Sequence, residues 1–157
     1  MHENIIPHAA SRCERRINAM VKQVSVFLEN RAGRLNQILK ILSDSGINIT
    51  SLSIADTGEY GIARLITEDH EKALKALNDG GMTAAETEVL AIEVSDKPGA
   101  LYNATKTLTD NDINVEYAYS AIPSEAGRAI IIIRVDDLAK ATQIISKAEG
   151  ITSLDKI

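Results

Sequence analysis

Two short polar segments contain the residues that could bind a ligand. The first holds Asn30, Arg31 and Arg34, and the second holds Asp96. An amide donates and accepts hydrogen bonds and a guanidinium pairs with carboxylates, so the first segment suits an anion or a zwitterion. An aspartate only accepts hydrogen bonds, so the second segment should bind a carboxylate less well. The sequence has no Ser-His-Asp, Cys-His or metal-ligand spacing, which argues against catalysis and against a metal site.

The residues around the first segment indicate that it joins a strand to a helix. Apolar residues alternate over 24–28, as in a half-buried strand, and recur over 35–42 at the spacing of one helix face. Gly46 then ends the helix, and Ile47 opens a second strand. The first N–H groups of a helix have no partner within it, so this loop suits a carboxylate or phosphate. We therefore expect a ligand site at the loop.

The same pattern occurs twice in the chain. Gly33 and Gly99 are 66 residues apart (99 − 33), and the same offset relates the flanking strand, loop and helix positions. A constant offset over this many positions indicates two copies of one structural unit, which are too few for a solenoid. The matched pairs include Val24 and Leu90, Val26 and Ile92, Leu28 and Val94, Asn30 and Asp96, Leu35 and Leu101, and Asn48 and Asn114.

Each copy is expected to follow the order βαββαβ. With right-handed crossovers, this order gives a four-stranded antiparallel sheet with both helices on one face, a ferredoxin-like α+β unit. The run 129–133 is apolar at every position, so both of its faces should be buried. The other domain, or a second subunit in a homodimer, should therefore cover the open face of the sheet.

The domain organisation is predicted from the repeat. We expect an N-terminal arm over 1–21, a first domain over 22–87 and a second domain over 88–157. The arm lacks apolar periodicity, so it is either a frayed segment or an artefact of a start codon placed before Met20. Since almost no linker separates the two copies, the domains should be neighbours.

Composition excludes several classes of function. A formal net charge of −5 and an aromatic content of 3% argue against nucleic-acid binding, which needs basic surfaces and stacking platforms. No apolar run reaches the ~20 residues of a membrane span. The single cysteine, Cys13, cannot form an internal disulfide, which suits a reducing cytoplasm. We expect no cofactor.

Two motifs, each split over two segments, resemble the ACT domain family of amino-acid-binding regulatory modules. They are residues 29–35 with 46–49, and residues 96–101 with 112–115. The resemblance extends from Lys22 to about Leu154. It implies a non-catalytic regulator whose ligand, often an amino acid, binds where two such domains meet, near the strand-to-helix loop. We expect a stand-alone tandem protein whose regulated enzyme is bound in trans.

The first copy also resembles the serine-binding regulatory domain of phosphoglycerate dehydrogenases. This resemblance implies that Asn30 and Asn48 contact the ligand. We expect the N–H groups after Gly33 to contact it as well. Leu28 stands where that family has a histidine, so serine itself is not implied as the ligand. The full set of predicted ligand contacts is Asn30, Arg31, Gly33, Arg34, Leu35, Asn48, Ile49, Asp96, Gly99, Ala100, Leu101 and Asn114.

Three alternatives remain open at this point. Gly33 and Gly99 can serve only a tight turn of positive φ, with Asn30 as a local cap. The protein could be an interaction module with degenerate ligand sites. The pair Arg31 and Asn48 also matches the arginine and asparagine of acylphosphatases, although the glycine-rich phosphate cradle of that family is missing.

Overall fold

The computed structural model describes residues 20–123 and 125–157, and it confirms an α+β fold of two βαββαβ units. Cys13 and most of the predicted arm therefore lie outside the described residues. The first unit contains β1 (Met20–Glu29), α1 (Arg34–Asp44), β2 (Ile49–Asp56), β3 (Tyr60–Thr67), α2 (His70–Asp79) and the first half of β4 (Thr83–Ser95). The second unit contains the rest of β4, then α3 (Ala100–Thr109), β5 (Val115–Ala121), β6 (Arg128–Val135), α4 (Leu138–Ile145) and β7 (Thr152–Leu154).

Strand β4 belongs to both units. It runs for 13 residues without a break, across the predicted boundary between 87 and 88. Its residues 83–90 pair with β1, and its residues 90–95 pair with β6. One seven-stranded antiparallel sheet results, in the order β2-β3-β1-β4-β6-β5, with β7 beside β4. The domains are therefore joined by a hydrogen-bonded strand.

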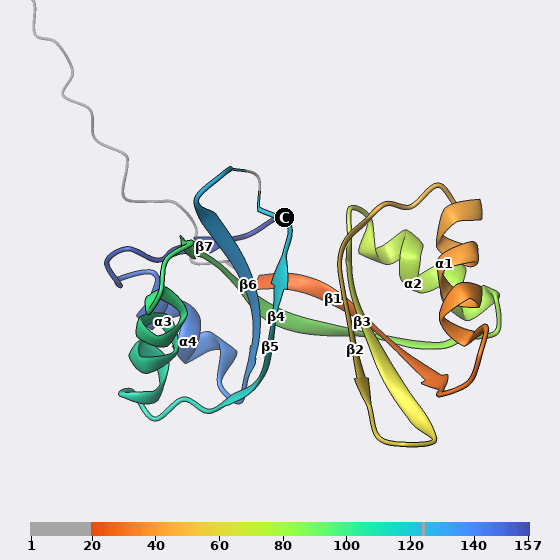
Figure 1. The fold of residues 1–157 in the computed structure, drawn as a ribbon, viewed down its shortest axis with the longest axis horizontal. Coiled ribbons are helices and arrows are strands. Elements are labelled where there is room, and N and C mark those ends of the chain that lie inside the picture. The colour runs from red at the N-terminus through yellow and green to blue at the C-terminus, as the bar shows by residue number, and fades with distance from the viewer. Residues whose placement is uncertain (1–19, 124) are drawn as a thin grey trace, which may run out of the picture.

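The single sheet curls so that its two halves face each other, with the helices on the outside (Figure 1). Alternate residues of β6 separate the two environments. Ile131 and Ile133 pack in the core beneath α3 and α4, whereas Ile130 and Ile132 pack in an inner core that includes Ile66 of the first domain. The open face of each half of the sheet is therefore covered by the other domain. This was one of the two predicted covers, and a second subunit was the other. A homodimer stays a prediction.

Each domain has a core of its own beneath its helices, and the inner core joins the two domains. β1 begins at Met20, two residues before the predicted start of the first domain. None of the helices within the described ranges is long and apolar enough to cross a membrane.

Candidate functional site

The two strand-to-helix loops have the same backbone geometry. Gly33 and Gly99 each precede a helix with φ 88° and ψ −14°, a left-handed conformation that favours glycine. Neither α1 nor α3 has a side-chain cap. By contrast, α2 and α4 are capped by Asp69 and Asp137, whose carboxylates accept from backbone N–H groups. The loops thus keep the open helix N-termini that the sequence predicts.

The side chains of the first loop already have partners within the chain. The carboxylate of Glu29 pairs with Arg31 at 2.5 Å and accepts from Arg34 at 2.7 and 3.0 Å. Hydrogen bonding from Arg34, with the charge of Arg31, lowers the pKa of the Glu29 carboxyl. Asn30 donates its amide to the carbonyl of Gly58 at 2.8 Å. These contacts tie the loop to itself and to the β2–β3 turn.

The structure places Asn30 and Asn48 at opposite ends of β3, so one domain does not bring them together, and their predicted contact with a shared ligand stays a prediction. Asn30 follows β1 beside the start of β3, and its N–H donates to Glu59. Asn48 precedes β2 beside the end of β3, where its amide donates to Glu68 at 3.3 Å. The seven steps from Tyr60 to Thr67 along β3 separate the two ends by about 23 Å, at ~3.3 Å per residue.

Other predicted contacts separate in the same way. Asp96 lies beside Gly127 at one end of β6, and Asn114 lies beside Asp136 at the other. In each motif the loop and the asparagine are close in sequence, which suggests that they lie together. In the structure the helix between them runs back along the preceding strand, so the asparagine lies at the opposite end of the sheet. Arg31 and Asn48 are likewise at opposite ends, so the acylphosphatase alternative loses its site.

The remaining predicted residues have structural positions of their own. Ala100 packs against the core of the second domain, and Ile49 packs against the core of the first. Leu35 is partly buried on α1, whereas Leu101 is 44% exposed on α3. Of the predicted set, only Asn48 and Ile49 line a cavity between the domains that has charged residues in its wall.

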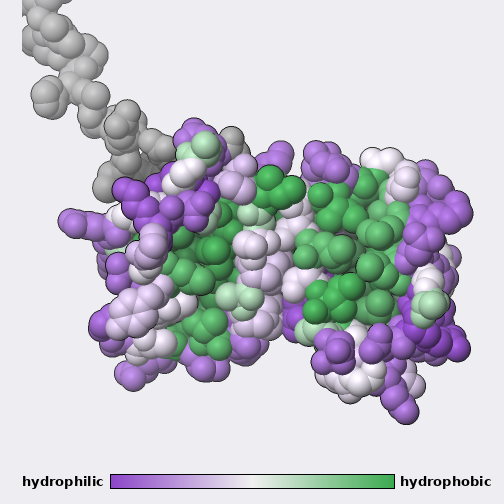
Figure 2. Space-filling view, in the orientation of Figure 1, coloured by the Kyte–Doolittle hydropathy of each residue, from purple (hydrophilic) through white to green (hydrophobic). Residues whose placement is uncertain are grey.

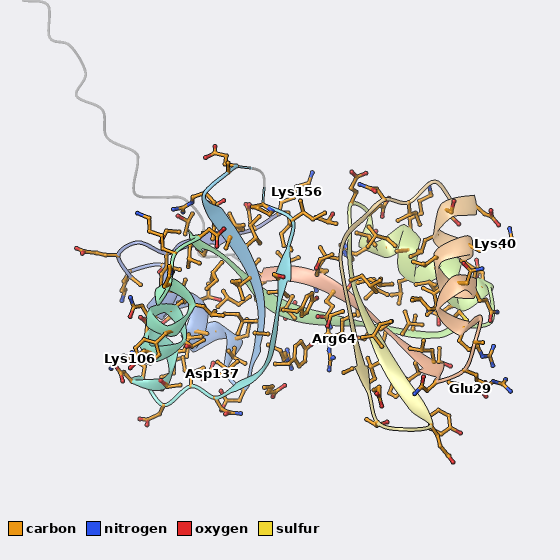
Figure 3. The ribbon with its side chains drawn as sticks, in the orientation of Figure 1. Glu29, Lys40, Arg64, Lys106, Asp137 and Lys156 are labelled. Atoms are coloured by element: carbon orange, nitrogen blue, oxygen red, sulfur yellow. The ribbon has the colours of Figure 1, made fainter. Side chains whose placement is uncertain are left out.

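This cavity of about 480 Å³ lies at the end of the interface where β2 begins and β5 ends. Figure 3 shows Lys156 at this end and Glu29, beside the first loop, at the far end of the first domain. We call this cavity the interdomain pocket. Its lining residues are Asn48, Ile49, Thr50 and Glu68 from the first domain, and Glu93, Ile122, Pro123, Ile130, Leu154, Lys156 and Ile157 from the second.

The pocket combines opposite charges with an apolar wall. Glu93 is neutralised by Arg128, whose Nε donates to its carboxylate at 2.9 Å. Glu68 and Lys156 have no ion pair among residues 20–123 and 125–157. The pocket therefore offers a carboxylate and an ammonium that are both available to a bound molecule.

The opposite end of the interface is closed by a polar cluster. Gln23 is fully buried, donates to the hydroxyl of Tyr117 at 3.0 Å and accepts from the hydroxyl of Tyr119 at 2.8 Å. The guanidinium of Arg64 lies 3.9 Å from the centre of the Tyr117 ring, a cation–π contact. Burial raises the pKa of the Tyr119 hydroxyl. We call these four residues the tyrosine latch, and Figure 3 shows Arg64 between the two halves of the sheet.

The sequence profile of the ACT domain pair family matches residues 19–152. The chain belongs to the ACT domain pair family. No curated protein matches its sequence.

Solved structures agree with this assignment. Protein BT0572 from Bacteroides thetaiotaomicron is 30% identical to this ACT domain pair over 89% of the present chain and 96% of its own, with a TM-score of 0.81. The ligand-free regulatory subunit of aspartate kinase from Thermus thermophilus is 14% identical and has a TM-score of 0.59, covering 82% of this chain and 92% of its own. At 14% identity the second likeness shows the fold alone. The resemblance to phosphoglycerate dehydrogenases stays a prediction.

Sequence reasoning missed most of the pocket of this ACT domain pair. Glu68 and Lys156 are 88 residues apart (156 − 68), and no motif connects them. One usable signal was Ile122 beside Pro123, an isoleucine at the edge of a turn, which the structure shows to be 74% exposed. Together with Pro123, Ile130, Leu154 and Ile157 it forms the apolar part of the pocket wall, and contiguous apolar surface of this kind can indicate a binding site.

Proposed function

We propose that this ACT domain pair is a non-catalytic regulator that binds a free amino acid in the interdomain pocket. The observation that carries the proposal is the pair Glu68 and Lys156, which line one pocket with opposite charges and without an ion pair in the described part of the chain. A free amino acid is a zwitterion, so it needs both a carboxylate and a cationic or amide donor. The pocket offers both at a size suited to a small molecule.

The roles of the polar residues follow from their chemistry. Glu68 would accept hydrogen bonds from the ligand's ammonium group, and Lys156 would pair with its carboxylate. Asn48 lies beside Glu68 and can donate to the carboxylate or accept from the ammonium, as its amide has both functions. Asn48 would thus contact the ligand, as predicted, but together with Glu68 and Lys156 of the pocket and not with the first loop.

Regulation would follow from the position of the pocket. Its walls come from both domains, so a bound ligand stabilises one arrangement of the domains over others. An enzyme bound in trans would then respond to the change in domain arrangement. The shared fold with regulatory subunits of aspartate kinase supports such a role. The loop residues around Gly33 and Gly99 stay a predicted second binding place, because their helix N-termini are open.

A thermal-shift screen with the twenty amino acids tests the proposal. A ligand that binds only the folded state adds about 2.7 kcal/mol at a hundredfold excess over Kd. Each kcal/mol moves the midpoint of a chain this long by roughly 2–4 °C, so a bound amino acid should raise it by about 5–10 °C. Asn48→Ala and Glu68→Gln should shrink the shift. Asn111→Ala, outside the pocket and both loops, is the matched control and should leave the shift unchanged.

If no amino acid at millimolar concentration moves the midpoint, an interaction module becomes the better function. One observation favours that second candidate. Leu52 and Ile54 are 40% and 44% exposed on β2, an edge strand of the sheet, and such a strand can pair with another chain. Figure 2 shows hydrophobic residues gathered on one face of both domains.

A further inference from the structure

We infer that the ligand of the interdomain pocket has an aliphatic side chain, and that this side chain fastens the second domain to the first. The inference rests on the proposed function and adds to it the class of amino acid and the way in which binding is transmitted. Its basis is the way in which the pocket divides its polar and apolar residues between the domains.

Polar groups of the first domain, together with Lys156 of the second, would hold the ligand's ammonium and carboxylate. Asn48, Thr50 and Glu68 all lie on the first-domain side of the pocket. The second domain contributes a mostly apolar wall, which consists of Ile122, Pro123, Ile130, Leu154 and Ile157. A ligand with its ammonium at Glu68 and its carboxylate at Lys156 would bury its side chain against this apolar wall.

The apolar wall includes a residue that the fold itself does not bury. Ile130 is 4% exposed and belongs to the inner core, but Ile122 is 74% exposed and belongs to no core cluster. A bound side chain would remove apolar area of Ile122 from water, which is favourable in proportion to the area covered. Ile122 is thus available to a ligand without any change in the core.

The same wall disfavours charged side chains. Its acidic residue, Glu93, is 19% exposed at the side chain and already pairs with Arg128. A second charge placed against it would lose water without gaining an unpaired partner, which is costly. Lys156 is the other charged residue that the second domain contributes to the pocket, and it would already be paired with the ligand's main-chain carboxylate.

Contact with the wall would be transmitted to the edge strands. Beside the pocket, the hydroxyl of Ser51 on β2 donates to the carbonyl of Ser120 on β5 at 2.8 Å. Ser51, Ser120 and Ile122 line one continuous groove with Ile49. A side chain long enough to touch Ile122 would stabilise the hydrogen bond between Ser51 and Ser120. Alanine would bind to the polar groups of the pocket, but its methyl group would not reach Ile122.

Binding measured by calorimetry on the full chain tests the inference with alanine, leucine, isoleucine, glutamate and lysine as probes. Leucine or isoleucine should bind at least tenfold more tightly than alanine, since each methylene buried contributes about fourfold, or ~0.8 kcal/mol. Ile122→Ser should weaken leucine binding by roughly fivefold or more and leave alanine binding unchanged. Ile54→Ser, an exposed isoleucine outside the pocket, is the matched control and should change neither.

Amide hydrogen exchange gives a second readout. Saturating leucine should slow exchange in residues 51–52 and 120–122, and saturating alanine should not. The inference is overturned if glutamate or lysine binds as tightly as leucine, or if Ile122→Ser leaves leucine binding intact. In those cases the proposed function still stands when Asn48→Ala and Glu68→Gln weaken binding. If no probe and no other amino acid binds, the proposed function fails and the inference fails with it.

Discussion

The two ends of the interface between the domains are built from the same sheet, yet one end is filled and the other is hollow. At the filled end, Gln23 is fully buried between the hydroxyls of Tyr117 and Tyr119. At the hollow end, the interdomain pocket encloses about 480 Å³. Hydrogen bonds at one end thus fix the spacing of the two sheet halves and allow the other end to stay open.

The repeat explains why the ends differ. Tyr117 and Tyr119 lie 66 residues after Ser51 and Ser53 (117 − 51 and 119 − 53), so they occupy matching positions on β5 and β2. The second copy places large rings on its inner face, and the first copy places small hydroxyl side chains there. The two copies therefore differ at these positions, where the rings of the second copy take part in the latch and Ser51 of the first copy bonds to Ser120 beside the pocket.

The largest expected effect comes from placing a charge in the inner core that both ends share. Ile132 is completely buried there, so Ile132→Asp should cost several kcal/mol as an unpaired buried charge. At roughly 2–4 °C per kcal/mol, the thermal midpoint should fall by ten degrees or more, or the protein should aggregate. Ile54→Asp, on an exposed edge, is the control and should change little. A variant that melts normally would show that the inner core does not hold the domains together.

The tyrosine latch should respond strongly to the loss of a single hydroxyl. Tyr119→Phe leaves the buried amide oxygen of Gln23 without its hydrogen bond, which costs about 1–3 kcal/mol. The midpoint measured by calorimetry should therefore fall by several degrees. Tyr102→Phe is a matched control, because Tyr102 is 65% exposed and lies outside the interface. Equal midpoints for the two variants would mean that the filled end of the interface is not a latch.

The fold could be predicted from the sequence because its signals are local and occur twice. The strand predicted over 24–28 lies within β1, and the helix face predicted over 35–42 lies on α1, where Ile38 and Leu42 are buried. The continuity of β4 could not be predicted, because residues 86–88 are polar and resemble a link between domains. In the structure this stretch is held by pairing with β1, where Lys22 bridges Glu86 and Glu88 at 2.8 Å.

The site was harder to predict, because the constant spacing of 66 residues between the two copies describes only part of each copy. The motif gave the left-handed glycines correctly, since Gly33 and Gly99 share one conformation. After the β5–β6 turn, however, the offset grows to 68 residues, as Asp69 and Asp137 show (137 − 69). A linear motif describes residues that are neighbours along the chain, whereas the interdomain pocket depends on how two sheet halves curl toward each other.

The pH dependence of stability provides a further test of the latch. The pKa of Tyr119 is raised in the folded state, so the folded protein keeps a proton that the unfolded chain loses near pH 10. The stability associated with this hydroxyl is fully present below that pH and declines as the pH rises further. The midpoint should therefore fall above about pH 10, and less steeply in Tyr119→Phe. Tyr102→Phe should retain the full slope, and an unchanged slope in Tyr119→Phe would place the titration elsewhere.

The smallest expected effect concerns Arg64. The other four arginines in the described residues, Arg31, Arg34, Arg128 and Arg134, pair with carboxylates, whereas Arg64 contacts the ring of Tyr117.

Arg64→Met keeps most of the apolar stem and removes only the cation, so it should cost about 0.5–1 kcal/mol. This corresponds to a loss of roughly 1–4 °C in the midpoint, which calorimetry resolves. In the Tyr117→Leu background the same substitution should cost nearly nothing, because the ring is gone. If the cost persists there, Arg64 acts through another contact, and the latch consists of the hydrogen bonds of Gln23 alone. Amino-acid binding at the hollow end should be the same in Arg64→Met and the parent, since the guanidinium does not line the pocket.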